Sequence, residues 1–140
     1  MRQALLISGI VFLIFVALAK DQTIATQASI PSVWVPSGEV MYKQFCAACH
    51  GAHAQGNGPA ASTLRTQPPN LTTLAKRHGG KFPYDYVSGV LLFGPGTSAH
   101  GSSDMPTWGP IFQTIDRNGE PAARDRIRNL ADYLASLQRK

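Results

Sequence analysis

The stretch Cys46-Ala47-Ala48-Cys49-His50 places two thiols and an imidazole within five residues. On a helical turn, both sulfurs lie on one side of the backbone, where each can add to one vinyl group of a haem to form a thioether. The histidine that follows can supply an axial nitrogen to the iron. We therefore expect one covalently bound haem c, attached through Cys46 and Cys49 and ligated by His50.

Three other interpretations of the cysteine pair compete with haem attachment. A structural zinc site needs four ligands, but the chain has no second cysteine pair, and His53, His78 and His100 show no zinc-ligand spacing. A thioredoxin-like dithiol needs a strand followed by a helix, which a stretch rich in glycine and proline does not offer. A disulfide between such near neighbours closes almost no loop and would stabilise little. The adjacent histidine therefore favours haem.

The N-terminal residues indicate export. Residues 4–19 are almost wholly apolar and follow a short positive segment, Met1-Arg2. Ala17-Leu18-Ala19 places small residues where a signal peptidase cleaves, and the run is shorter than the ~20 residues of a typical membrane span. We predict a signal peptide over residues 1–19, cleaved near Ala19, with an uncleaved membrane anchor as the alternative. Either places the chain in the periplasm or on the outer face of the cytoplasmic membrane.

The remaining chain divides into a linker and one domain. Residues 20–36 are polar, contain two prolines and lack a helical period, which predicts a linker whose Trp34 packs on the domain over residues 37–140. The formal charge of +5 could steer a redox partner with an acidic docking surface or bring the domain near anionic lipid, and basic residues on solvated helix faces are the alternative. Nucleic acid is not expected, because basic and aromatic residues are not interleaved.

Periodic apolar residues predict three main helices. The first begins at the N-cap Ser37 and leads into Cys46, the second spans residues 84–93, and the third runs from Pro121 to Leu137. Short turns of helix are expected at residues 60–64 and 70–75. The expected apolar positions are Val40, Met41 and Phe45 in the first helix, Val87, Val90, Leu91 and Phe93 in the second, and Ile127, Leu130, Leu134 and Leu137 in the third.

A loop follows the haem-attachment residues. Cys49-His50-Gly51, followed by Gly56-Asn57-Gly58-Pro59, resembles bacterial class I cytochromes c with one haem. The resemblance covers roughly residues 37–138 and implies an all-α fold of four to five short helices around the haem, with the N- and C-terminal helices crossing. In that family a proline carbonyl accepts the proton on the outer nitrogen of the haem histidine, and Pro59 matches that position.

The same resemblance extends to Met105-Pro106. In class I cytochromes a methionine before a proline, in a loop between two helices, is the sixth iron ligand, because proline holds the preceding residue extended. This implies Met105 as the second axial ligand, with His100 as its rival. Trp108 is expected to pack near the haem ring or donate its N–H to a propionate, and simple core packing remains open.

We predict a turn over residues 111–120, between the Met105 loop and the last helix. Candidate propionate partners are Arg65, Lys76, Arg77 and Lys81.

The leading functional hypothesis is electron transfer, not enzyme catalysis. A haem with both axial positions filled passes electrons and leaves no open site for a small-molecule substrate. The chain would be a carrier or a respiratory-complex subunit whose partners are other redox proteins, reaching the membrane through an uncleaved N-terminus. The alternative is a haem enzyme of the peroxidase or nitrite-reducing type, in which Met105 only packs and the distal side is open. A haem-based gas sensor is a weaker third possibility.

Overall fold

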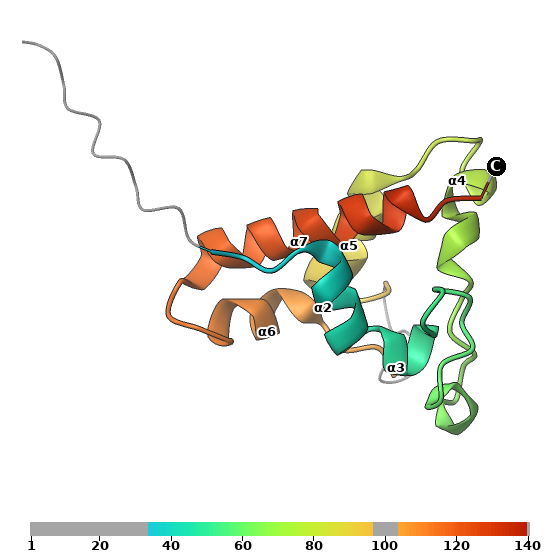
Figure 1. Cartoon of the computed structure of the whole chain (residues 1–140), viewed down its shortest axis with the longest axis horizontal. Helices are drawn as coiled ribbons and strands as arrows, with labels where there is room; N and C mark the ends of the chain where they lie inside the picture. Colours follow the sequence, from blue (N-terminus) through green and yellow to red (C-terminus); the bar gives the residue numbers. More distant parts are fainter. Residues whose placement is uncertain (1–33, 97–103, 140) are drawn as a thin grey trace, which may run out of the picture. The chain divides into compact units, whose positions relative to one another are not determined.

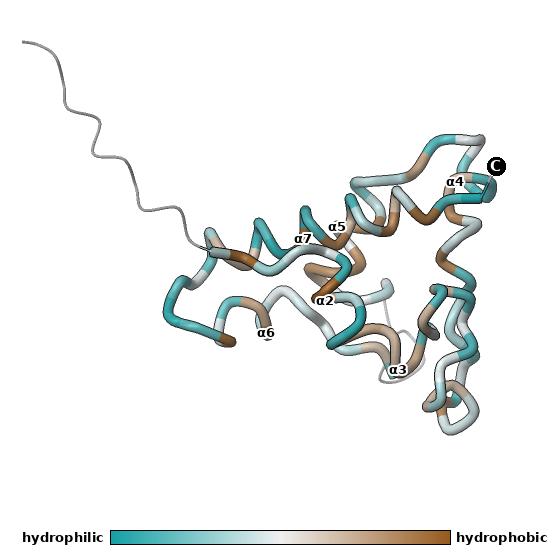
Figure 2. Tube along the Cα trace, viewed as in Figure 1, coloured by the Kyte–Doolittle hydropathy of each residue, from teal (hydrophilic) through white to brown (hydrophobic). Residues whose placement is uncertain are grey.

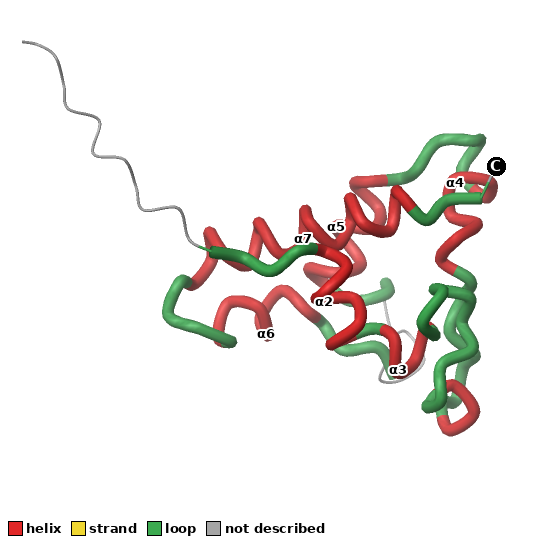
Figure 3. The backbone as a smooth tube through the Cα atoms, in the orientation of Figure 1, coloured by secondary structure: helices red, strands yellow, loops and turns green. Residues whose placement is uncertain are grey.

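The computed structural model describes residues 34–96 and 104–139, so the predicted export segment, most of the linker and His100 lie outside the described residues. In these two ranges the backbone forms helices and loops without a strand, which confirms the all-α prediction (Figure 3). No helix here is long and apolar enough to span a bilayer. The elements are α2 (Gly38–Phe45), α3 (Ala47–His50), η1 (Ala61–Thr63), η2 (Leu71–Thr73), α4 (Leu74–Arg77), α5 (Tyr84–Phe93), α6 (Trp108–Thr114) and α7 (Gly119–Ser136).

Helix α2 begins where its cap predicts. The Ser37 hydroxyl oxygen accepts a hydrogen bond from the Val40 amide at 3.3 Å, which satisfies one of the free N–H groups of the first turn. Met41 is fully buried, as expected for a core residue, whereas Val40 on the same turn is 53% exposed and contributes no core surface. The buried side of α2 therefore faces the rest of the domain and leads directly to Cys46.

Helices α2 and α7 cross in close contact, which confirms the predicted crossing of the N- and C-terminal helices (Figure 1). A Cβ atom at Gly38 would lie 1.9 Å from the carbonyl oxygen of Asn129, so only glycine allows the two backbones to approach this closely. The Asn129 side-chain amide donates to the Pro36 carbonyl at 3.1 Å. The crossing thus depends on a glycine at the start of α2 and on polar contact just before it.

Helix α7 forms the base on which α2, α5 and α6 pack. Ile127, Leu130 and Leu134 are buried along one face, and Leu137 just beyond the helix is half-buried. Figure 2 shows hydrophilic and hydrophobic residues alternating along α7, the pattern of a helix with one face in the core. The helix begins at Gly119, two residues before the predicted start at Pro121.

The predicted bounds of α5, residues 84–93, agree with the structure. Val87 and Leu91 are buried, but Phe93 is 81% exposed, so its assignment to the apolar face was wrong. Phe93 is the last residue of the helix and directly precedes Gly94, beyond the turns of α5 that face the core. Trp34 is also exposed, at 80%, which contradicts the prediction that it packs on the domain.

The prediction of a turn over residues 111–120 was wrong for its first part, because α6 extends to Thr114 and the turn is confined to residues 115–118. The prediction rested on Asp116-Arg117-Asn118-Gly119, which lies at the end of that range. Pro110 in fact lies in the first turn of α6, where the backbone N–H that proline lacks would have no helical partner. Trp108, Gly109 and Phe112 are buried, so packing against the core forms a helix that local propensity did not reveal.

Candidate functional site

A cavity of about 670 Å³ opens among the helices, within the roughly 300–1,000 Å³ typical of sites that enclose a small molecule or cofactor. Its walls come from α2, α3, the segment from residue 64 to α4, α5, the loop before α6, and α7. Most of the lining is apolar. The lining residues include Tyr42, Phe45, Cys46, Cys49, His50, Leu64, Pro69, Leu71, Leu74, Val87, Val90, Leu91, Met105, Trp108, Leu130 and Leu134.

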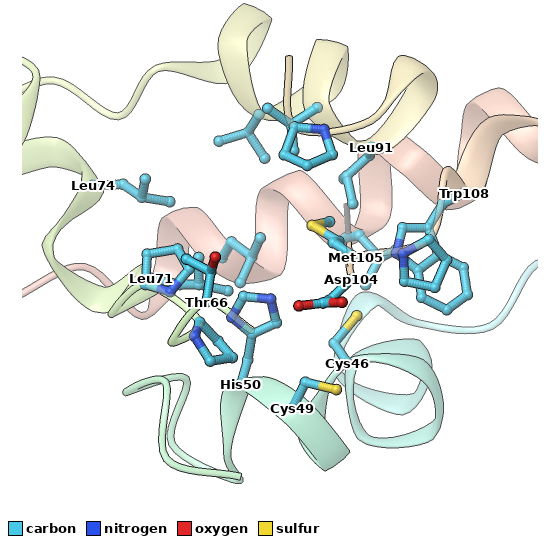
Figure 4. A pocket seen from close by; sticks show the side chains of 18 of the residues that line it. Cys46, Cys49, His50, Thr66, Leu71, Leu74, Leu91, Asp104, Met105 and Trp108 are labelled. Carbon is cyan, nitrogen blue, oxygen red and sulfur yellow. The ribbon is translucent and has the colours of Figure 1, made fainter. Parts of the chain in front are cut away.

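Both cysteines line this cavity and carry free thiols (Figure 4). Cys46 is the C-cap of α2, and Cys49 lies in the short helix α3 that follows. Burial, and secondarily the neighbouring Cys49, raises the pKa of the Cys46 thiol to about 12. The Cys46 thiol thus stays protonated near pH 7. Both sulfur atoms are free and lie on one wall of the pocket, where thioether bonds could form.

The His50 imidazole enters the pocket from the same wall (Figure 4) and is 8% exposed. Burial lowers its pKa, and an interaction with the backbone of Pro69 partly opposes this shift. The ring is thus kept neutral near pH 7, which is the form that ligates metals. Among the residues that the structure describes, none meets the distance and angle of a hydrogen bond to the buried Nδ1 of His50.

The local backbone fixes where His50 lies. Gly51 follows it with φ of +83°, a conformation that favours glycine, and the Gly51 carbonyl accepts a hydrogen bond from the Tyr42 hydroxyl at 2.6 Å. The amide of Gly58 donates to the Cys49 carbonyl at 3.1 Å, and that of Ala60 to the Ala48 carbonyl at 2.9 Å. These bonds fold the following loop back against α3 and hold the imidazole in place.

Pro59, the expected partner of the haem histidine, is exposed and does not line the pocket. The backbone of Pro69 acts on His50 instead. The reason lies in the loop: the Gln67 side-chain amide donates to the Gly56 carbonyl at 2.7 Å, and the Gly56 amide donates to the His50 carbonyl at 2.8 Å. These bonds draw the Pro68-Pro69 segment toward the pocket wall, so Pro69 is a second candidate partner beside Pro59.

Met105 lines the pocket from the loop before α6, and its side chain is half-buried against the hydrophobic core. Figure 4 shows its sulfur directed into the same cavity as the His50 ring. Trp108 also lines the pocket and is 9% exposed; its ring lies 5.4 Å from Phe112 and 5.5 Å from Phe45, centroid to centroid. The structure therefore brings Met105 and Trp108 to the pocket that holds the cysteines and His50.

The candidate propionate partners separate into two groups. Arg65 and Arg77 line the pocket, whereas Lys76 and Lys81 are exposed away from its lining. His78 and Tyr86, which the sequence analysis did not select, also line it, with ring centroids 5.3 Å apart. His78 directly follows the basic residues Lys76 and Arg77 of α4, and Tyr86 lies in α5, so only the tertiary structure brings the two rings together.

The other interpretations of the cysteine pair find no support in the described ranges. No group of three metal-ligating side chains forms among residues 34–96 and 104–139, as a zinc site would require. The thiols are not joined in a disulfide, and the part of the chain around them contains no strand that could begin a thioredoxin-like motif.

A haem fits the residues that are present. Two free thiols and a neutral imidazole share one wall, a thioether approaches from another, and the cavity between them is apolar and of sufficient volume. Sulfur and imidazole are ligands suited to iron in a haem. Cys46, Cys49 and His50 would hold the group on the α3 side, with Met105 on the opposite loop.

Comparison with known proteins agrees with this geometry. No curated protein and no solved structure matched the chain. The sequence model of the cytochrome c family matches residues 35–138, which span most of the chain and contain the attachment residues, the loop with Met105 and the crossing helices. The chain therefore belongs to the cytochrome c family and is a protein of covalently bound haem c.

Proposed function

We propose that this protein is an electron carrier, or the carrier subunit of a respiratory complex, whose haem iron is ligated by His50 and Met105. Members of the cytochrome c family are generally electron carriers. The observation that carries the ligand assignment is that the His50 imidazole and the Met105 thioether enter one apolar pocket from different walls (Figure 4).

When bound, the haem supplies one-electron redox chemistry at its iron. The residues of this chain hold and tune it. Cys46 and Cys49 bind its edge covalently, and His50 is kept neutral by burial so that its nitrogen can ligate. Leu74, Val87 and Leu91 contribute apolar surface that excludes water and so favours the less charged, reduced state.

With both axial positions occupied, no open site remains for a substrate, which argues against a peroxidase or a nitrite-reducing enzyme. No contact of the described residues favours that alternative. Its candidate acid-base residue His100 lies outside the described residues, and the Asp104 carboxylate is hydrogen-bonded to the Arg65 amide.

The proposed location is the periplasm or the outer face of the cytoplasmic membrane, in keeping with the apolar N-terminal residues. The proposed partners are redox proteins with acidic docking surfaces. Arg65 and Arg77 are exposed and line the pocket, and the formal charge of the chain is +5. Electron exchange with such a partner should slow as salt is added, because screening weakens the steering of opposite charges.

The experiment that tests the ligation is an optical spectrum of the oxidised holoprotein. Met105 as a ligand predicts a weak far-red band from sulfur-to-iron charge transfer, lost in Met105→Ala. Met41→Leu is the matched control, because Met41 is buried in the core and a volume-conserving exchange there should leave the band intact. A band that persists in Met105→Ala would remove Met105 as the ligand. Ready binding of carbon monoxide by the reduced wild-type protein would favour the enzyme alternative.

A further inference from the structure

Two segments distant in sequence meet beside Met105. The backbone N–H of Arg65 donates a hydrogen bond to Oδ2 of Asp104 at 2.8 Å, and the guanidinium Nε of Arg65 lies 3.7 Å from Oδ1. Both residues line the pocket, and the Asp104 side chain is only 24% exposed. The loop that carries Met105 is therefore joined to a distant segment of the pocket wall.

On the Arg65 side, the backbone conformation places the amide where it can donate to Asp104. The 3₁₀ turn η1 ends at Thr63, and its C-cap Leu64 is extended with φ of −85° and ψ of 147°. The Arg65 amide therefore lies beyond the hydrogen-bonded turn, and it donates to Asp104. A carboxylate that accepts from an N–H forms a stronger bond than a neutral acceptor does.

On the other side, Asp104 is the residue immediately before Met105, and Pro106 is the residue after it. Proline restricts Met105 to an extended backbone but makes no hydrogen bond through its own nitrogen. Extended backbone alone does not fix where the thioether lies relative to the opposite wall. A contact of the neighbouring residue 104 with a distant segment adds a constraint on that position.

We propose that Asp104 is a positioning residue for Met105: by accepting from the Arg65 amide, its carboxylate holds the loop across the pocket and keeps the thioether directed at the iron. This inference rests on the proposed ligation by His50 and Met105. It assigns the decisive contact to the backbone of Arg65, and a secondary one to its guanidinium, which lies farther away and on a largely exposed side chain.

The test is competition between Met105 and added imidazole for the oxidised iron of the holoprotein. A loop that is held less firmly gives up its ligand more easily. Asp104→Ala should bind imidazole roughly tenfold more tightly or more, the change expected when a hydrogen bond to a charged acceptor is lost. Asp104→Asn keeps a side-chain oxygen acceptor without the charge and should lie between wild type and Asp104→Ala. Asp85→Ala removes an exposed carboxylate away from the pocket and should leave imidazole affinity unchanged.

Two variants at residue 65 separate backbone from side chain. Arg65→Ala keeps the N–H and should raise imidazole affinity less than Arg65→Pro does. Arg65→Pro removes the N–H and should reproduce the effect of Asp104→Ala; the extended conformation of Leu64 is one that a residue before proline adopts readily. A readout independent of ligand exchange is hydrogen exchange of the Arg65 amide, which should accelerate in Asp104→Ala.

The outcomes are distinct. If wild type shows the sulfur-to-iron band but Asp104→Ala binds imidazole as wild type does, the positioning role is overturned, and this holds even if the variant melts at a lower temperature. If Arg65→Ala weakens the loop as much as Arg65→Pro, the backbone assignment is overturned. If wild type lacks the band, the proposed ligation fails and the positioning role fails with it.

Discussion

The two sides of the haem pocket are held in different ways. The His50 side is built from consecutive residues and is secured by backbone hydrogen bonds within a short loop, by the buried Tyr42 hydroxyl and by the crossing of α2 with α7. The Met105 side is half-buried, with Asp104 joined to Arg65 before it and the buried Trp108 after it.

This difference indicates which of the two proposed iron ligands is easier to displace. A side chain fixed by many local bonds keeps its position when one of them is lost, because its neighbours in sequence still constrain it. A side chain fixed by contacts between distant segments depends on each contact separately. We therefore expect changes on the Met105 side to alter ligand exchange, and changes on the His50 side to alter stability first.

Replacement of Trp108 should have the largest effect. Trp108→Ala removes a buried ring that contacts Phe45 and Phe112, which should lower the free energy of unfolding by about 3–5 kcal/mol. It should also increase imidazole affinity of the oxidised holoprotein, because Trp108 anchors the loop after Met105. Denaturant unfolding and imidazole titration measure the two effects. Ile111→Ala, at a 38% exposed residue of the same helix, is the control and should change both little. If Trp108→Ala lowers the stability but leaves imidazole affinity unchanged, the proposed difference between the two sides of the pocket is wrong.

Next in size is the helix crossing on the His50 side. Gly38→Ala would place a Cβ 1.9 Å from the Asn129 carbonyl oxygen, so α2 and α7 must separate, at a cost of about 2–3 kcal/mol of unfolding free energy. Gly89→Ala is the matched control: a Cβ there meets no atom within 4 Å, and alanine in a helix should add about 0.5–1 kcal/mol. Thermal or denaturant unfolding measures both. Equal effects of the two variants would show that the crossing does not require glycine.

A smaller loss of unfolding free energy is expected when Tyr42 is replaced. Tyr42→Phe leaves the Gly51 carbonyl without its buried donor and should cost about 1 kcal/mol near pH 7. Burial raises the pKa of Tyr42 above its ordinary value of about 10, so the folded state keeps a proton that the unfolded state releases at high pH. The tyrosine's contribution is therefore complete below about pH 10 and declines above it. Unfolding measured across this range should show the gap between wild type and variant narrowing, and a constant gap would argue against the buried hydroxyl.

The smallest effect is expected at Phe93. This residue is 81% exposed at the end of α5, so Phe93→Ser should change the free energy of unfolding by less than about 0.5 kcal/mol and leave imidazole affinity unaltered. Leu91→Ser, two residues earlier and buried, is the contrast and should be strongly destabilising. A large loss of unfolding free energy in Phe93→Ser would mean that the Phe93 side chain is covered in the folded protein. If imidazole affinity also rose, Phe93 would be a further contact that holds the Met105 side.

Much of the site could be predicted because it is local. The attachment cysteines and His50 are separated by at most four positions, so their side chains must share one wall whatever the rest of the chain does. Ser37 and Asn70 cap the helical turns that follow them, since a cap depends only on residues within one turn. The apolar stripe of α7 similarly predicted its buried face.

The sequence was less informative where distant segments decide. Pro59 and Pro69 both lie in Gly-rich or Pro-rich stretches, and the bond that draws residue 67 against Gly56 makes Pro69 a second candidate for contact with His50. Helix α6 forms because packing buries Trp108 and Phe112, although Gly109-Pro110 favours a loop by local propensity.

The sequence by itself therefore determined the chemistry of attachment: two thiols and an imidazole, spaced so that bond lengths and one helical turn place them together. Tertiary structure alone decided what lies opposite them. Contacts between distant segments determine whether Trp34, Phe93 and Trp108 are exposed or buried. Such a contact also joins Asp104 to Arg65, and the sequence does not show which segments will meet. Local spacing is set by covalent geometry, whereas the far wall of a pocket is set by how the helices pack.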